Sequence, residues 1–162
     1  MGAKIYQFEW IDDFAAAKNF ASSKAKYEWI AFLDADEYFS EEDARKVLYY
    51  VRQLQDKRYD AILSSWVHLM DDGTISAVGT QSRVFRNSRG VRYVGRIHEY
   101  ITSVDGSDFR FVDAVNELSI YHTGYGKALH DGKVSSGRNL KIILKELEEH
   151  PDSHRMLGYL GD

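Results

Sequence analysis

Asp34-Ala35-Asp36-Glu37 places three carboxylates directly after the apolar run Trp29-Ile30-Ala31-Phe32-Leu33. Carboxylate oxygens are the ligands that hard divalent cations prefer, and a bound cation can neutralise the charge of a diphosphate. Alternate side chains of an extended segment point the same way, so Asp34 and Asp36 are expected to address one cation. The alternative is an acidic turn that merely precedes the next helix.

The elements before this cluster indicate an α/β protein. Residues 4–8 are typical of a short strand, and Asp12 or Asp13 is expected to cap a helix that runs to about Lys26. The unbroken apolar run 29–33 suits a strand that is covered on both faces. Strand, helix and strand in this order predict a parallel βαβ unit, with the carboxylates at the sheet edge where ligands bind.

The rest of the chain predicts a second helix, a series of strands and C-terminal helices. Ser40 is expected to cap a helix whose apolar face carries Ala44, Val47, Leu48, Val51 and Leu54. The turn signal Asp71-Asp72-Gly73 predicts an antiparallel hairpin between strands over residues 59–70 and from residue 74 onward. Further strands are expected around residues 84–86, 93–101, 109–112 and 118–122, and helices over 139–149 and after Pro151.

Composition excludes several classes of function. Lys+Arg 21 against Asp+Glu 25 leaves a net charge of -4, so nucleic acid is not expected as a partner. The absence of cysteine excludes disulfides and thiolate metal sites, and it fits a reducing, cytoplasmic location. No apolar run approaches the ~20 residues that a bilayer span needs, so a soluble chain is expected.

Several segments in order resemble the family 2 glycosyltransferases of the GT-A fold. The resemblance rests on residues 14–19, 29–33 and 34–37, and on the downstream segments 83–87, 94–99 and 120–125, which are similar to bacterial members with Asp-Ala-Asp-Glu. It covers nearly the whole chain. It implies part of a GT-A fold, a mixed sheet flanked by helices, with residues 1–126 as the transferase domain and 127–162 as a C-terminal helical extension.

The resemblance also implies roles for individual residues. Asp36 would bind Mn²⁺ or Mg²⁺, Asp34 would contact the nucleotide ribose and the metal through water, and His122 would add a third protein contact to the metal. Members of this family invert the anomeric centre, which implies a carboxylate base, and Glu99 is the candidate. Glu37 could compete as the base or support the carboxylate pair, and His122 could be an ordinary strand histidine.

A second group of residues is expected to bind the nucleotide sugar. Lys18-Asn19 stands where related sequences carry Arg-Asn on the helix before the carboxylates, and Arg96 belongs to the same set of donor-binding candidates. Lysine lacks the planar fork of arginine, so only a point-charge contact is expected there. The alternatives are a solvated helix face for Lys18 and a strand-end ion pair of Glu99 with Arg96 or Arg92.

The sequence thus predicts a metal-dependent, inverting transfer of sugar from a nucleotide-diphosphate donor to a glycan, lipid or peptide acceptor. Related enzymes begin with a strand, a helix and a strand that hold the nucleobase, and none of these precedes Met1. An N-terminally truncated transferase with an exposed sheet edge is therefore expected, and such an edge favours a homo-oligomer. The alternatives are a non-catalytic binding or assembly module, and a phosphatase-like Asp-x-Asp hydrolase, from whose pattern Tyr38 departs.

Overall fold

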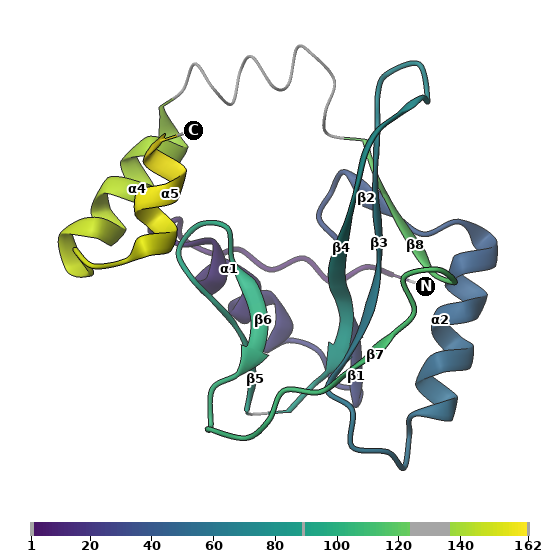
Figure 1. Ribbon diagram of the computed structural model, residues 1–162. Coiled ribbons are helices and arrows are strands. Elements are labelled where there is room, and N and C mark those ends of the chain that lie inside the picture. Colours follow the sequence, from purple (N-terminus) through teal and green to yellow (C-terminus); the bar gives the residue numbers. More distant parts are fainter. Residues whose placement is uncertain (1, 89, 124–136, 162) are drawn as a thin grey trace.

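The computed structural model describes residues 2–88, 90–123 and 137–161 as a mixed α/β arrangement (Figure 1). The helices are α1 (Phe14–Ser22), α2 (Glu41–Gln53), α4 (Arg138–Glu149) and α5 (His154–Gly161). The strands are β1 (Trp29–Ala31), β2 (Glu37–Tyr38), β3 (Ala61–Leu69), β4 (Ile75–Arg86), β5 (Val91–Val94), β6 (Tyr100–Ser103), β7 (Phe111–Asp113) and β8 (Ser119–His122). Among the described residues, no helix combines the length and the apolar character needed to cross a membrane.

A mixed six-stranded sheet forms the centre of the structure, with the path β1-β4-β3-β8-β2. The long hairpin of β3 and β4 is antiparallel, as the turn signal at residues 71–73 predicts. Strand β3 pairs in parallel with both β7 and β8, whereas β1 and β2 pair antiparallel at the two ends of the path. A separate two-stranded sheet contains β5 and β6. The predicted mixed sheet with flanking helices and C-terminal helices is confirmed.

The predicted N-terminal βαβ unit is wrong. Residues 4–8 form no strand, and Ile5 is 90% exposed, so this segment buries too little apolar surface to join the sheet. The strand after α1 is β1, and it pairs antiparallel with β4 rather than in parallel with an N-terminal neighbour. It is also not covered on both faces, because Ile30 is buried while Ala31 is exposed.

The predicted helix caps are confirmed. The Asp13 carboxylate accepts a hydrogen bond from the backbone N–H of Ala16 at 2.8 Å, and α1 ends at Ser22, earlier than predicted. Ser40 accepts from the backbone N–H of Asp43 at 3.0 Å and begins α2. Side-chain oxygens at these positions satisfy N–H groups that have no partner within the helix.

Helix α2 covers one face of the sheet (Figure 1). Its buried apolar residues pack with core residues of the sheet and of the segment before β8; the cluster contains Val47, Leu54, Ile62, Val84, Ala114 and Leu118. The predicted apolar face is only partly correct, because Ala44 and Leu48 are exposed while Asp43 is buried. The Asp43 carboxylate accepts from the backbone N–H of Ser119 at 3.1 Å, which ties α2 to β8.

The C-terminal helices α4 and α5 pack beside α1 and the loop between β5 and β6 (Figure 1). Their core cluster contains Ile97, Ile142, Ile143 and Met156, with Phe14, Leu147 and Tyr159 against it. The predicted single strand over residues 93–101 is two strands, because the backbone turns at Gly95 and His98, both of which have positive φ. The predicted domain boundary after residue 126 lies outside the described residues.

Candidate active site

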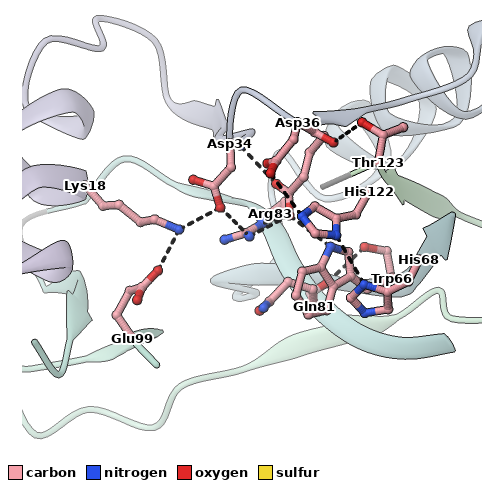
Figure 2. A network of polar contacts seen from close by, with 12 residues as sticks. Lys18, Asp34, Asp36, Trp66, His68, Gln81, Arg83, Glu99, His122 and Thr123 are labelled. Carbon is pink, nitrogen blue, oxygen red and sulfur yellow. Dashed lines mark hydrogen bonds and ion pairs between the residues drawn. The ribbon is translucent and has the colours of Figure 1, made fainter. Parts of the chain in front are cut away.

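The carboxylate cluster forms a turn that leads into β2 at Glu37, so Asp34 and Asp36 do not lie in one extended segment. The backbone N–H of Glu37 donates to the carbonyl oxygen of Asp34 at 3.0 Å, and the Asp34 N–H donates to Oε2 of Glu37, also at 3.0 Å. Alternation along a strand predicts that Asp34 and Asp36 face one point, and in this turn they do not. They turn toward different partners (Figure 2). The acidic-turn alternative describes the backbone correctly, but each carboxylate has its own side-chain contacts.

Glu37 lies buried beneath the site. Its side chain is fully buried and that of Arg83 is 5% exposed; Oε1 of Glu37 accepts from Arg83 at 2.6 Å (Nη2) and 3.2 Å (Nε). Trp66 donates its indole N–H to the same oxygen at 2.9 Å. Burial opposes the charge of Arg83, but Glu37, with Asp34, raises the pKa of Arg83 above its ordinary value. With all these partners, Glu37 supports the cluster instead of facing a substrate.

Lys18 bridges two carboxylates at the front of the site. Its ammonium group lies 3.0 Å from Oδ2 of Asp34 and 2.7 Å from Oε1 of Glu99 (Figure 2). Arg83 also reaches Oδ2 of Asp34, at 2.8 Å. The Lys18 side chain is only 9% exposed, so the solvated-face alternative is wrong. The alternative pairing of Glu99 with Arg96 or Arg92 is replaced by this contact with Lys18.

Asp36 belongs to a second group, which includes two histidines. Its Oδ2 lies 3.3 Å from Nε2 of His122, and the Nδ1 atoms of His122 and His68 lie 3.2 Å apart (Figure 2). The pairing of Glu37 with His122 between β2 and β8, and of His68 with His122 between β3 and β8, determines this arrangement. Burial lowers the pKa of His68, and the neighbouring His122 lowers it further.

These groups open into one cleft of about 630 Å³. Its sheet side is lined by Asp34, Asp36, Trp66, Gln81, Arg83 and His122, and its other side by Lys18 of α1, Glu99 and residues of α4 and α5, including Arg138, Arg155 and Tyr159. Two carboxylates at the turn, a third across the cleft and several cations between them suit a polar, anionic ligand.

Comparison with known proteins identifies the family. The family model described as glycosyl transferase family 2 matches residues 1–114 of the chain. The chain belongs to glycosyl transferase family 2. The predicted family is therefore confirmed, and the mixed α/β arrangement agrees with part of the GT-A fold that this family implies.

Two relatives named as glycosyltransferases agree with this family assignment. The SPbeta prophage-derived glycosyltransferase SunS of Bacillus subtilis is 29% identical over 154 residues, which cover 94% of the chain and 35% of that protein. Glycosyltransferase SunS of Bacillus phage SPbeta matches equally well. A TPR repeat-containing protein of Synechococcus elongatus is 26% identical over 168 residues, covering 99% of the chain and 40% of that protein. The chain thus spans 35 to 40% of the length of these relatives.

Family 2 enzymes commonly use a divalent metal, and one pair of side chains in this chain fits such an ion. Oδ2 of Asp36 and Nε2 of His122 lie 3.3 Å apart, close enough to contact one cation, and a mixed oxygen and imidazole set suits Mn²⁺. The Asp34 carboxylate is directed at Lys18 and Arg83 instead. Accordingly, the described residues contain no cluster of three metal-binding side chains.

Two residues predicted to bind the donor, Asn19 and Arg96, are not among the described residues that line the cleft. Both contact other parts of the protein instead. Asn19 exchanges two hydrogen bonds of 2.9 Å with the backbone of Tyr93 and so holds β5 against α1. Arg96 forms ion pairs with Glu146, at 3.0 Å, and with Glu149, which raises the pKa of Arg96.

Three residues around the cleft are not indicated by the sequence alone: Trp66, His68 and Arg83. Arg83 stood within one of the segments that carry the family resemblance, but nothing in that segment indicated its buried contacts. The one sequence feature that could have indicated His68 is its polar side chain within an otherwise largely apolar strand. Its partner His122 is 54 residues away in sequence. Only the pairing of β3 with β8 brings the two imidazoles together.

Proposed function

We propose that this chain carries the donor site of a metal-dependent, inverting glycosyltransferase that uses a nucleotide-diphosphate sugar. The observation that carries the proposal is the single cleft into which Glu99 and the Asp36–His122 pair both open. A sugar bound there would have a metal site on one side and a carboxylate on the other. The acceptor is a glycan, lipid or peptide.

Asp36 and His122 would hold Mn²⁺ or Mg²⁺, and the bound ion would neutralise charge on the departing diphosphate. Asp34 would receive the nucleotide ribose, with Lys18 and Arg83 holding its carboxylate in place. Lys18 would add a positive charge beside the diphosphate.

Glu99 would act as the base. It would take the proton of the acceptor as the acceptor oxygen attacks the anomeric carbon opposite the leaving group. Its side chain is 14% exposed and stands 2.7 Å from Lys18, which holds it at the edge of the cleft. Glu37 is a poor alternative for this role, because it is fully buried and bonded to Arg83 and Trp66.

Calorimetry with UDP, GDP and CDP in the presence of Mn²⁺ tests the donor site. We expect one nucleotide to bind the native chain, and Asp36→Asn to weaken that binding by at least about tenfold, the loss that disturbed metal sites show. Asp71→Asn, in the exposed β3–β4 turn, is the matched control. Equal binding by the native chain and Asp36→Asn contradicts the proposed metal site.

A donor turnover assay tests the reaction. We expect release of nucleoside diphosphate, and Glu99→Gln should abolish turnover while nucleotide binding persists. Nucleotide binding without any turnover by the native chain would support the non-catalytic binding module. Release of sugar phosphate would support a hydrolase and contradict sugar transfer.

We also propose that copies of the chain associate through β1. This strand ends the sheet, and among the described residues β4 is its pairing partner on one side. A free strand edge offers backbone groups to a second chain. Light scattering after gel filtration should give a dimer or larger species, and a monomer at high concentration contradicts this. The cytoplasmic location stays a prediction.

A further inference from the structure

The loop over residues 95–99 presents Glu99 to the cleft and has an unusual backbone. Gly95 has φ +91° and His98 has φ +52°. A glycine adopts such angles freely, but a histidine in the left-handed region persists only where its surroundings hold it there. His98 directly precedes Glu99, so any relaxation of its backbone redirects the Glu99 side chain.

Helix α5 holds His98 from two directions. The ring of Tyr159 stacks on the His98 imidazole, with centroids 3.7 Å apart and planes at 15°. The Arg155 guanidinium donates a hydrogen bond to the His98 carbonyl oxygen. The same guanidinium lies 4.6 Å above the ring of Tyr100. The residues on both sides of Glu99 are therefore in contact with α5.

Helices α1, α4 and α5 all contact the preceding part of the loop. Ile97 is 4% exposed within the cluster that includes Ile142, Ile143 and Met156 of α4 and α5. Arg96 pairs with Glu146 and Glu149 of α4, and its carbonyl oxygen accepts from the N–H of Phe14 at 2.8 Å. Each residue from Arg96 to His98 thus has a partner in α4 or α5.

We infer that the α4–α5 pair positions the base of the reaction: Tyr159 and Arg155 hold His98 in its left-handed conformation, and His98 in turn directs Glu99 toward Lys18 and the cleft. The inference rests on the proposed role of Glu99. Tyr159 and Arg155 are positioning residues that act through His98. Helices α4 and α5 therefore contribute to catalysis as well as forming one wall of the cleft.

Amide hydrogen exchange on the whole chain tests the positioning directly. We expect the backbone amides of residues 95–100 to exchange roughly tenfold faster in Tyr159→Ala and in Arg155→Met, because each variant removes a contact that opposes local opening of the loop. Tyr159→Phe keeps the stacked ring and should exchange like the native chain. Leu157→Ala, on the exposed face of α5, is the matched control. Unchanged exchange in the β3–β4 hairpin verifies that each variant is folded.

Donor turnover in the presence of Mn²⁺, with UDP-glucose and GDP-mannose as probes, supplies the second readout. Tyr159→Ala should lower kcat by roughly 10- to 100-fold, the cost of misplacing a catalytic group by about 1 Å, while KM stays within about twofold. Tyr159→Phe should restore kcat, because the aromatic ring makes the contact.

The two proposals fail in different ways. Native-like exchange of residues 95–100 in Tyr159→Ala overturns the positioning inference, whichever donor the enzyme accepts. Native kcat in Tyr159→Ala also overturns it, even where Glu99→Gln is inactive. Equal turnover by the native chain and Glu99→Gln overturns the role of Glu99, while faster exchange in Tyr159→Ala would still show that α5 restrains the loop.

Discussion

The buried pair of Glu37 and Arg83 makes a quantitative prediction about stability. Glu37→Gln preserves the shape of the side chain but removes its charge and one of its two acceptor oxygens. The native carboxylate accepts from Arg83 and Trp66 at Oε1 and from the Asp34 N–H at Oε2. In the variant, the amide NH₂ must face one of these donors, so at least one buried donor loses its partner.

Two effects determine the size of the loss. A buried donor without a partner costs about 1–3 kcal/mol, and breaking a buried ion pair by removing one partner costs about 3–5 kcal/mol in total. Arg83 keeps Asp34 at 2.8 Å, which places the expected loss near the lower end of that range. For a chain of this size, a loss of about 3 kcal/mol corresponds to a Tm that is roughly 6–12 °C lower.

Urea unfolding followed by tryptophan fluorescence and circular dichroism measures this loss. Glu41→Gln is the matched control, because Glu41 pairs with Arg45 on the surface of α2 with 84% of its side chain exposed. That variant should change the free energy of unfolding by less than about 0.5 kcal/mol. A loss below about 1 kcal/mol in Glu37→Gln would refute the reasoning that the buried network stabilises the fold.

Two further predictions concern the elements around the cleft. Asn19→Ala removes two hydrogen bonds to the backbone of Tyr93 and should lower the free energy of unfolding by about 1–3 kcal/mol in urea. Burial, together with the charge of Arg155, lowers the pKa of His98, although Glu99 acts in the opposite direction. Below the ordinary value of 6.5 the unfolded chain then binds more protons than the folded chain at this position. The free energy of unfolding should therefore fall as pH drops from about 7.5 to 5.5, and His98→Asn should reduce that fall, since asparagine tolerates positive φ.

Both predictions have simple controls. Asn116→Ala, in an exposed turn, should leave the free energy of unfolding within about 0.5 kcal/mol of the native value. An Asn19→Ala variant as stable as Asn116→Ala contradicts the bracing role of the Asn19 amide. For His98, stability curves for the native chain and His98→Asn that stay parallel between these pH values contradict a titration at this residue.

Local patterns predicted several elements because their causes lie within a few residues. The side chains of Asp13 and Ser40 cap helices by accepting from N–H groups three residues later. Asp71-Asp72-Gly73 predicts its hairpin because Gly73, with φ +81°, turns the chain locally. The N-terminal strand was wrong for the opposite reason. A short apolar segment joins a sheet only where the fold brings a strand edge beside it. The sequence of residues 4–8 does not carry that information.

The sequence by itself determined the family, the positions of the carboxylates and most helices and strands, since these depend on residue order and local spacing. The tertiary structure alone decided which side chains meet. Lys18 reaches Asp34 and Glu99, and His68 reaches His122, through contacts between elements distant in the chain. The tertiary structure also separated the carboxylates: Asp34, Glu37 and Glu99 pair with cations, whereas Asp36 lies beside His122. Burial and strand register act between distant elements, so no local sequence pattern contains this information.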